Sequence, residues 1–180
     1  LLGEALLRAV ASERLGVAPQ DVRFGATPEG KPWLVGFPDL HLNLSHGGEW
    51  VICASGPRAV GVDVEPVRPL SPELPPEVCS QDELRNLDGP DAEAHFARLW
   101  TVKEAYVKAL GVGLGMDLRR LEARPDALLL DGRPLPGIDV HTFAPDARHR
   151  GAVCVLGGPA PQDLRVRDLS WLRRAGGAGP

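Results

Sequence analysis

The stretch "LWTVKEAYVKALG", residues 99–111, is the most informative part of the sequence because it combines an apolar helical stripe with three charged residues. Trp100, Glu104 and Lys108 are spaced four residues apart and share one face of a helix, which Lys103 borders. The apolar residues follow helical spacing and predict a second, core-facing stripe: Leu99, Val102, Ala105, Tyr106, Ala109 and Leu110. This segment is therefore predicted to be an amphipathic helix with one ionic face.

Some forty residues earlier, "AVGVDVE", residues 59–65, alternates with the period of a β-strand. Its valines are predicted to face the core, while Gly61, Asp63 and Glu65 share the other face. Carboxylates two residues apart on a strand lie about 7 Å from one another and repel. A cation between them would remove that repulsion; a solvated face at a sheet edge is the alternative.

Glu104 strengthens the first interpretation, because a strand and a facing helix together would supply three oxygen ligands for a hard cation such as magnesium. Such sites complete their coordination with water and substrate phosphates, and Lys108 beside them would suit a polyphosphate. Glu104 and Lys108 are equally compatible with an exposed ion pair on a helix surface.

The rest of the chain reads as short elements joined by turns, which predicts an α+β fold. Helices are predicted at 1–15, at a short segment opened by the capping box of Ser80 and Glu83, and at 91–110. Strands are predicted at 22–24, 40–46, 49–55, 59–65, 119–123, 127–130, 138–143 and 151–156. Residues 66–78 are predicted to be a loop with at most a turn of helix, and 173–180 a flexible tail.

Composition narrows the function classes. The chain has 180 residues with 43% hydrophobic and 24% charged residues, as soluble globular proteins do. The net charge of −4 gives no field to attract nucleic acid or an anionic membrane. The sequence has no apolar run of membrane-spanning length and no signal peptide. Its three cysteines, an odd number without a close pair, are predicted to be buried thiols in a reducing cytoplasm.

Two polar turns complete the candidate site. "NLSH", residues 43–46, ends a strand with Ser45 and His46 in front of a glycine turn. His46 is either a phosphate donor or an ordinary turn histidine. "GKP", residues 30–32, places Lys31 in a turn from which its ammonium would reach the same anion, although this motif says little by itself.

Together, "GKP", "NLSHGGEWVICA", "GVDVEP" and "LWTVKEAYVKALGVGL" closely resemble the Sfp-type 4′-phosphopantetheinyl transferases, over about residues 2–157. The resemblance implies an enzyme that transfers the phosphopantetheine arm of coenzyme A to a serine hydroxyl of an acyl or peptidyl carrier protein. The reaction would need magnesium and release adenosine 3′,5′-bisphosphate. The implied fold has two similar lobes, 1–58 and 59–172, related by a pseudo-twofold, with coenzyme A in the cleft between them.

The resemblance also implies residue roles. Asp63, Glu65 and Glu104 match the metal ligands, and Glu104 also matches the general base for the serine. Lys108 matches the lysine that contacts the pyrophosphate and protonates the leaving group. The remaining matches concern coenzyme A: Lys103, Ser45 and His46 near the phosphates, and Lys31 with Pro32 against the adenine.

The resemblance implies a further basic segment before the first helix, which grips the 3′-phosphate of coenzyme A. The sequence begins after that segment, so we expect either that it is trimmed or that this phosphate is held less well. Two rival functions stay open: a magnesium-dependent phosphohydrolase, and a non-catalytic relative that binds coenzyme A or a carrier. The resemblance favours carriers of polyketide or nonribosomal-peptide synthesis, in secondary metabolism, and a monomeric cytoplasmic enzyme.

Overall fold

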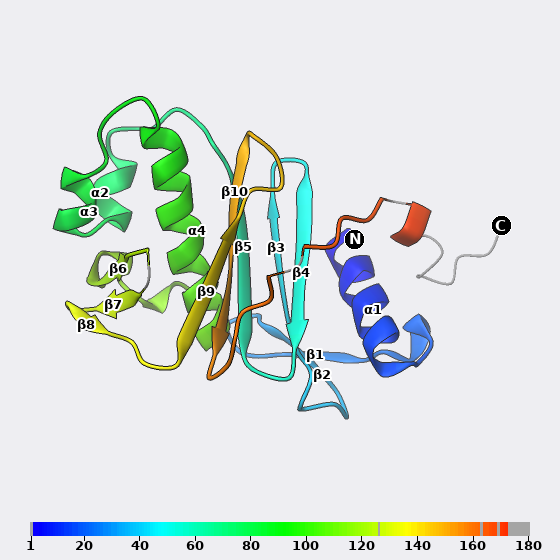
Figure 1. Ribbon diagram of the computed structural model, residues 1–180. Helices are drawn as coiled ribbons and strands as arrows, with labels where there is room; N and C mark the ends of the chain where they lie inside the picture. The colour runs from blue at the N-terminus through cyan, green and yellow to red at the C-terminus, as the bar shows by residue number, and fades with distance from the viewer. Residues whose placement is uncertain (1, 126, 163, 169, 173–180) are drawn as a thin grey trace.

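The computed structural model describes residues 2–125, 127–162, 164–168 and 170–172, and its fold is mixed α+β as predicted (Figure 1). The predicted tail, 173–180, lies outside the described residues. The helices are α1 (Leu2–Leu15), α2 (Leu74–Val78), α3 (Gln81–Arg85) and α4 (Ala92–Leu110), with 3₁₀ turns η1 (Pro19–Asp21), η2 (Gly113–Gly115) and η3 (Leu118–Arg120). The strands are β1 (Phe24–Ala26), β2 (Pro32–Leu34), β3 (His41–Gly47), β4 (Trp50–Gly56), β5 (Val60–Pro66), β6 (Leu121–Ala123), β7 (Leu128–Leu130), β8 (Arg133–Pro134), β9 (Ile138–Phe143) and β10 (His149–Leu156).

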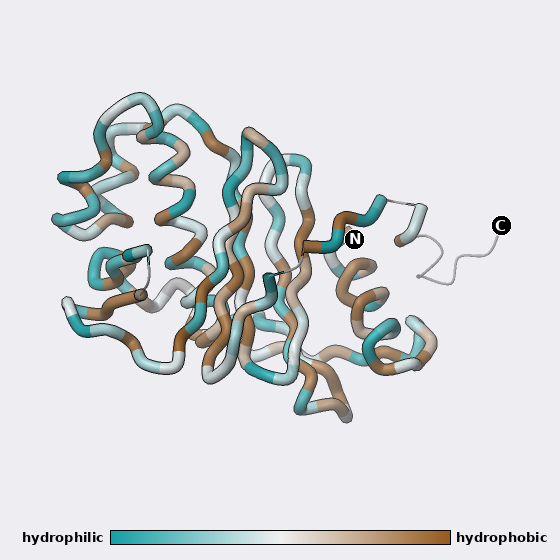
Figure 2. The backbone as a smooth tube through the Cα atoms, viewed as in Figure 1, coloured by the Kyte–Doolittle hydropathy of each residue, from teal (hydrophilic) through white to brown (hydrophobic). Residues whose placement is uncertain are grey.

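The strands form four small antiparallel sheets. β5, β10 and β9 make one three-stranded sheet in that order, and β6, β7 and β8 make another. β3 pairs with β4 across the glycine turn, and β1 pairs with β2. β10 places Ala152 opposite Asp63 and Arg150 opposite Glu65. In Figure 2 hydrophobic residues recur along the central strands and on α1.

β5 is covered on both faces, which rules out the solvated-edge interpretation of its carboxylates. Val60, Val62 and Val64 pack into a core with residues of β4 and β10. The opposite face meets α4 at Gly61, where a Cβ would lie 2.0 Å from the carbonyl oxygen of Ala105. Glycine is therefore required here because the helix backbone lies directly on the strand. This close approach brings α4 to the face that carries Asp63.

β3 lies beside β5 and joins the two halves of the chain (Figure 1). The side-chain oxygen of Asn43 accepts a hydrogen bond from the backbone N–H of Val62 at 2.8 Å, in the place where a strand partner would accept it. Gly47 also approaches closely, because a Cβ there would lie 2.2 Å from the carbonyl oxygen of Val64. The polar face of β3 thus points at the carboxylates of β5.

Each half packs one long helix against antiparallel strands: α1 on β3 and β4, and α4 on β5 and β10 (Figure 1). This repetition agrees with the two-lobe expectation, while the pseudo-twofold and the lobe boundaries stay predictions. The capping box of α3 is confirmed, since Ser80 and Glu83 exchange both hydrogen bonds. The sequence did not predict β2 and β8, which have only three and two residues.

Candidate active site

A cavity of about 310 Å³ opens where β3, β5 and α4 meet. It brings together six of the predicted site residues, from both halves of the chain. Its lining is formed by Leu44, Ser45, His46, Asp63, Glu65, Trp100, Glu104 and Lys108. The strand, the helix and the "NLSH" turn therefore do meet around one space.

Asp63 lies at the centre of this cavity and is 3% exposed. Its Oδ1 accepts hydrogen bonds from the Ser45 hydroxyl at 2.8 Å and the Lys108 ammonium at 2.6 Å. Its Oδ2 is buried and has no hydrogen-bond partner. Buried carboxylate oxygens normally have partners, so a lone one indicates a place where a ligand or ion binds.

Glu65 and Glu104 are half-buried on the same cavity. Burial raises the pKa of both carboxyls above the usual value, and the nearby Asp63 charge raises each pKa further. The Lys108 ammonium works in the opposite direction on both. The cavity thus holds more negative charge than its one lysine neutralises, and a bound cation would lower the electrostatic cost.

Lys108 crosses from α4 to the first half of the chain. Its ammonium donates to Ser45 at 3.1 Å as well as to Asp63. An ammonium has three protons, so these two acceptors leave one donor for a ligand. The side chain is 28% exposed, which gives that donor access to the cavity.

Lys103 does not belong to this cavity, which corrects the expectation that it lies near phosphates. Its side chain is completely buried and contacts the end of α2 and Glu83 of α3. These two helices lie beside α4 (Figure 1). The ammonium donates to the carboxylate of Glu83 and to the carbonyl oxygens of Val78 and Leu118. Consecutive residues of an α-helix are rotated by about 100° around its axis, so the side chains of Lys103 and Glu104 point to different sides of α4.

Lys31 and Pro32 also lie outside the cavity, although both were predicted to contact coenzyme A. The Lys31 ammonium donates to three backbone carbonyls, those of Val60, Lys108 and Ala109, and so caps the C-terminal end of α4. Burial lowers the pKa of this lysine. In this arrangement Lys31 fastens the β1–β2 hairpin to the second half of the chain.

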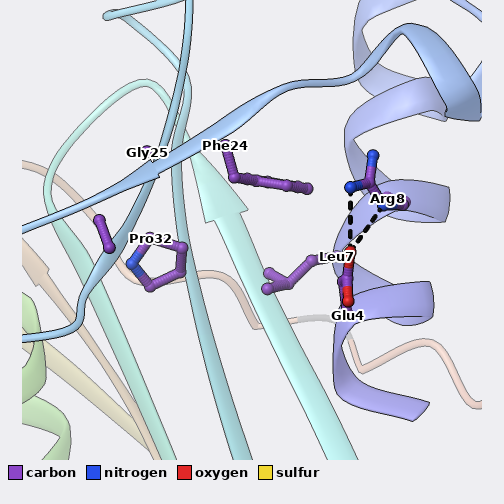
Figure 3. A pocket seen from close by; sticks show the side chains of 7 residues that line it. Glu4, Leu7, Arg8, Phe24, Gly25 and Pro32 are labelled. Atoms are coloured by element: carbon purple, nitrogen blue, oxygen red, sulfur yellow. Dashed lines mark hydrogen bonds and ion pairs between the residues drawn. The ribbon is translucent and has the colours of Figure 1, made fainter. Parts of the chain in front are cut away.

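Pro32 lines a different cavity of about 400 Å³ between α1 and the β1–β2 hairpin (Figure 3). Glu4 and Arg8 of α1 form an ion pair at 2.9 Å on its wall, and the Arg8 guanidinium lies over the ring of Phe24. Although this cavity is larger, its charged groups already neutralise each other. The chemistry predicted from the sequence is concentrated in the smaller cavity.

One lining residue escaped the sequence analysis, and Trp100 was placed on the correct helix face but given no role. Leu44 lines the cavity although its alternation in β3 predicts an inward apolar residue only. Trp100 stands edge-on to Phe96 with ring centroids 5.8 Å apart, which fixes one wall. Cys79 and Cys154 are buried as predicted, whereas Cys53 is only partly buried. Burial raises the pKa of Cys53 and Cys154 to about 12 and that of Cys79 to about 11.

A metal centre is not preassembled in the described part of the chain: no group of three or more His, Cys, Asp or Glu side chains there is close enough to hold an ion. The carboxylates share the cavity but keep apart, and Lys108 takes one oxygen of Asp63. No helix among the described residues is long and apolar enough to cross a membrane.

Comparison with known proteins identifies the family of this chain. Residues 59–154 match the model of the 4′-phosphopantetheinyl transferase superfamily, and residues 1–58 match that of the 4′-phosphopantetheinyl transferase N-terminal region. The chain is 33% identical to the 4′-phosphopantetheinyl transferase Sfp of Bacillus subtilis, over 92% of this chain and 77% of that one. It is 32% identical to a 4′-phosphopantetheinyl transferase of Bacillus pumilus, over 92% and 74%.

The chain therefore belongs to the 4′-phosphopantetheinyl transferase superfamily, and it is an enzyme that transfers phosphopantetheine to carrier proteins. Among solved structures, a holo-[acyl-carrier-protein] synthase of Thermotoga maritima matches 54% of this chain and 62% of its own at a TM-score of 0.41 and 23% identity. That likeness is too small to support a conclusion about the site.

Proposed function

We propose that this enzyme takes the phosphopantetheine arm from coenzyme A, places it on a serine hydroxyl of an acyl or peptidyl carrier protein, and releases adenosine 3′,5′-bisphosphate. The observation that carries the proposal is the shared cavity of Asp63, Glu104 and Lys108. Displacement at phosphorus needs charge neutralisation and in-line positioning, and this cavity offers a carboxylate base beside a free ammonium donor.

Glu104 is the best-placed base for the serine proton. A serine hydroxyl is a weak nucleophile, so a carboxylate within reach must take its proton as it attacks. Burial and the neighbouring Asp63 raise the pKa of Glu104, which makes it a stronger base than an exposed glutamate.

Lys108 and His46 would bind the diphosphate. The third proton of the Lys108 ammonium points to a role as donor to a phosphate oxygen, and then to the leaving group. His46 is exposed at the rim of the cavity, where a ring N–H would donate to a second phosphate oxygen. The Ser45 hydroxyl donates a hydrogen bond to Asp63 and so fixes the orientation of this carboxylate in the cavity.

Magnesium fits the residues present. The free Oδ2 of Asp63 offers a buried anionic ligand, and Glu65 and Glu104 supply further carboxylate oxygen atoms on the same cavity. Magnesium usually takes one or two protein carboxylates and completes its shell with water and phosphates, so a preassembled cluster is unnecessary. When bound, the ion would neutralise the charge that develops on the diphosphate.

Glu104 then has two roles that oppose each other, because a carboxylate that binds the ion strongly is a weaker base. Either Glu104 takes the serine proton directly while Asp63 and Glu65 hold the ion, or Glu104 also binds the ion and the proton leaves through a water molecule. The broad carrier range of Sfp-type enzymes, which the sequence resembles, favours carriers of polyketide and nonribosomal-peptide synthesis.

The test is intact-mass spectrometry of purified apo carrier proteins of both kinds, incubated with this enzyme, coenzyme A and magnesium. A mass gain of one phosphopantetheine arm is expected, and it should disappear without magnesium and with Glu104→Ala. Coenzyme A cleavage without a carrier would instead show a phosphohydrolase. Binding of coenzyme A without cleavage or transfer would show a non-catalytic relative.

A further inference from the structure

The Lys103–Glu83 pair is an ionic contact that is sealed inside the second half of the chain. The Lys103 side chain is 0% exposed, and its ammonium lies 2.5 Å from Oε2 of Glu83. Its other two protons go to the carbonyl oxygens of Val78 at 2.8 Å and Leu118 at 3.1 Å. All three donors of the ammonium are thus used within the protein.

Both carboxylate oxygens of Glu83 also have hydrogen-bond partners within the protein. Its Oε2 also accepts the backbone N–H of Ser80, and its Oε1 accepts that of Ala123, both at 2.8 Å. The pair therefore ties together the end of α2, the start of α3, η3, β6 and α4. These segments come from sequence positions 78–123, and no regular ladder of backbone hydrogen bonds joins them.

Stability alone does not explain such a pair. A buried ion pair rarely stabilises a fold more than well-packed apolar residues do, because both charges lose their hydration. Its distinctive property is connectivity: the hydrogen bonds of Lys103 and Glu83 all form together only while these segments keep their present arrangement. The carbonyl of Val78 lies at a short helix end and accepts from Lys103, while the carbonyl of Leu118 lies in a 3₁₀ turn and accepts from both Lys103 and the backbone N–H of Leu121.

α4 is consequently held from two sides. On one side Gly61 of β5 lies directly on the helix backbone. On the other side Lys103 locks the helix to α2, α3 and η3. A shift of α4 along or around its axis would move Glu104 and Lys108 together relative to Asp63, whose carboxylate Lys108 contacts at 2.6 Å. Misplacement of reacting groups by about 1 Å costs on the order of a hundredfold in rate.

We propose that Lys103 and Glu83 form a positioning pair for the transfer reaction: they fix the height and rotation of α4 so that Glu104 and Lys108 face Asp63. The inference rests on the proposed function of that cavity. Lys103 itself touches no group of the cavity, so it is not a catalytic residue. It also replaces the phosphate-contact role that the sequence resemblance implied for this lysine.

The experiment compares Lys103→Met, Glu83→Gln and the double variant with the wild-type enzyme, well below the melting temperature of each variant. Transfer to an apo carrier gives kcat and KM, and calorimetric titration gives the Kd of coenzyme A. We expect kcat to fall about tenfold or more in each single variant, with the Kd of coenzyme A within about threefold of wild type. The double variant should be no slower than Lys103→Met, because the pair acts as one unit.

Arg85→Gln is the matched control, since it breaks an exposed ion pair with Asp82 on the same short helix. Its kcat should equal that of wild type. If Lys103→Met does not fold, the positioning role is tested with Glu83→Gln, because glutamine keeps the shape of glutamate and one acceptor oxygen. Hydrogen exchange of the amides of 78–85 and 118–123, measured in Glu83→Gln, should accelerate while that of β3 and β4 stays unchanged.

Two results would overturn the positioning role. An unchanged kcat per folded molecule with a lowered melting temperature would make the pair purely structural. A variant that binds coenzyme A about tenfold more weakly but keeps its kcat would indicate that Lys103 contacts the phosphates of coenzyme A. A wild-type enzyme that transfers nothing would overturn the proposed function first, and the positioning role with it.

Discussion

Two lysines of α4, five residues apart, are in opposite situations. Lys103 is completely buried and gives every proton to an acceptor of the protein. Lys108 is 28% exposed and shares Asp63 with Ser45, while the second oxygen of Asp63 has no partner. The same residue type thus builds structure on one side of the helix and an open binding site on the other.

The contrast between Lys103 and Lys108 separates a structural ionic group from a functional one. A buried network in which every atom is paired holds its segments rigidly, whereas an unpaired buried atom costs free energy that only a ligand recovers. The face of α4 that carries Lys108 has this unpaired atom beside it, together with the raised pKa of Glu104. Around Lys103, every side-chain polar atom of the pair has a partner: the Lys103 ammonium has three acceptors, and both Glu83 oxygens accept hydrogen bonds.

The largest effect is expected from Asp63→Asn. The change keeps the shape and the hydrogen bond from Ser45 but removes the charge that Lys108 contacts, so we expect transfer to fall about a thousandfold. The measurement is kcat/KM with an apo carrier. Asp139→Asn is the control, because Asp139 lies in β9, is absent from the lining of the cavity and accepts the backbone N–H of Ala160. Equal losses in the two variants would mean that the cavity is not the active site.

The two lysines should also differ in stability. Lys103→Met leaves the Glu83 carboxylate buried without its cation, so the free energy of unfolding should fall by about 3–5 kcal/mol. Lys108→Met also removes the cation of a buried carboxylate, but Asp63 keeps its hydrogen bond from Ser45 and borders the cavity, so a smaller loss of about 2 kcal/mol is expected. Urea denaturation of both variants measures the difference. A loss at Lys108 as large as that at Lys103 would break the comparison between the two faces.

The variant Gly61→Ala tests the close contact between β5 and α4. The added methyl group would meet the helix backbone at Ala105, so strand and helix must separate. We expect about 3 kcal/mol of lost stability in urea denaturation, at the upper end of the usual cost of overpacking. Gly56→Ala is the control, since a Cβ there meets nothing within 4 Å. If both variants unfold at the same urea concentration, the close approach does not hold α4.

The smallest effect concerns the charge of Glu104. Its pKa in the folded enzyme lies above the usual value, chiefly because of burial and then because of Asp63. The folded state therefore binds the proton more tightly than the unfolded chain, and the charged form costs stability above that raised pKa. The cost is relieved as the pH falls through the raised pKa, and it vanishes below the ordinary glutamate pKa of about 4.

Glu104→Gln removes this cost, so its melting temperature at pH 7 should exceed that of the wild type by about 2 °C, without coenzyme A or metal. The difference should shrink towards zero near pH 4, where the wild-type carboxyl is also neutral. Scanning calorimetry at both values checks the sign. A variant less stable than wild type at pH 7 would show that Glu104 is held by favourable contacts instead of strained by burial.

Most of the fold followed from local patterns. The long helix is bounded by Pro90 and Gly111, and the observed α4 matches it closely because its apolar stripe and its C-terminal glycine are both local signals. The capping box at Ser80 was equally local. β2 and β8 were missed because strands of two or three residues have no period to detect, and their pairing depends on neighbours.

The site was predicted in part. Asp63, Glu65, Glu104 and Lys108 were found because their spacing on a strand and a helix placed them on single faces. The place of Lys103 was missed, although one signal existed: it lies four residues after Leu99 and three before Tyr106, on the apolar stripe. A lysine at such a position predicts a buried partner, and Glu83 had been noticed only as a capping residue.

The family, the main helices and strands, and the face on which each carboxylate lies could all be predicted from the sequence, because they depend on residue type and on spacing along the chain. Which charges are paired and which are open became known only from the packed structure. Pairing depends on segments far apart in sequence, such as Ser45 with Asp63 and Glu83 with Lys103. Burial then sets the cost of each charge, and burial is a property of the packed molecule alone.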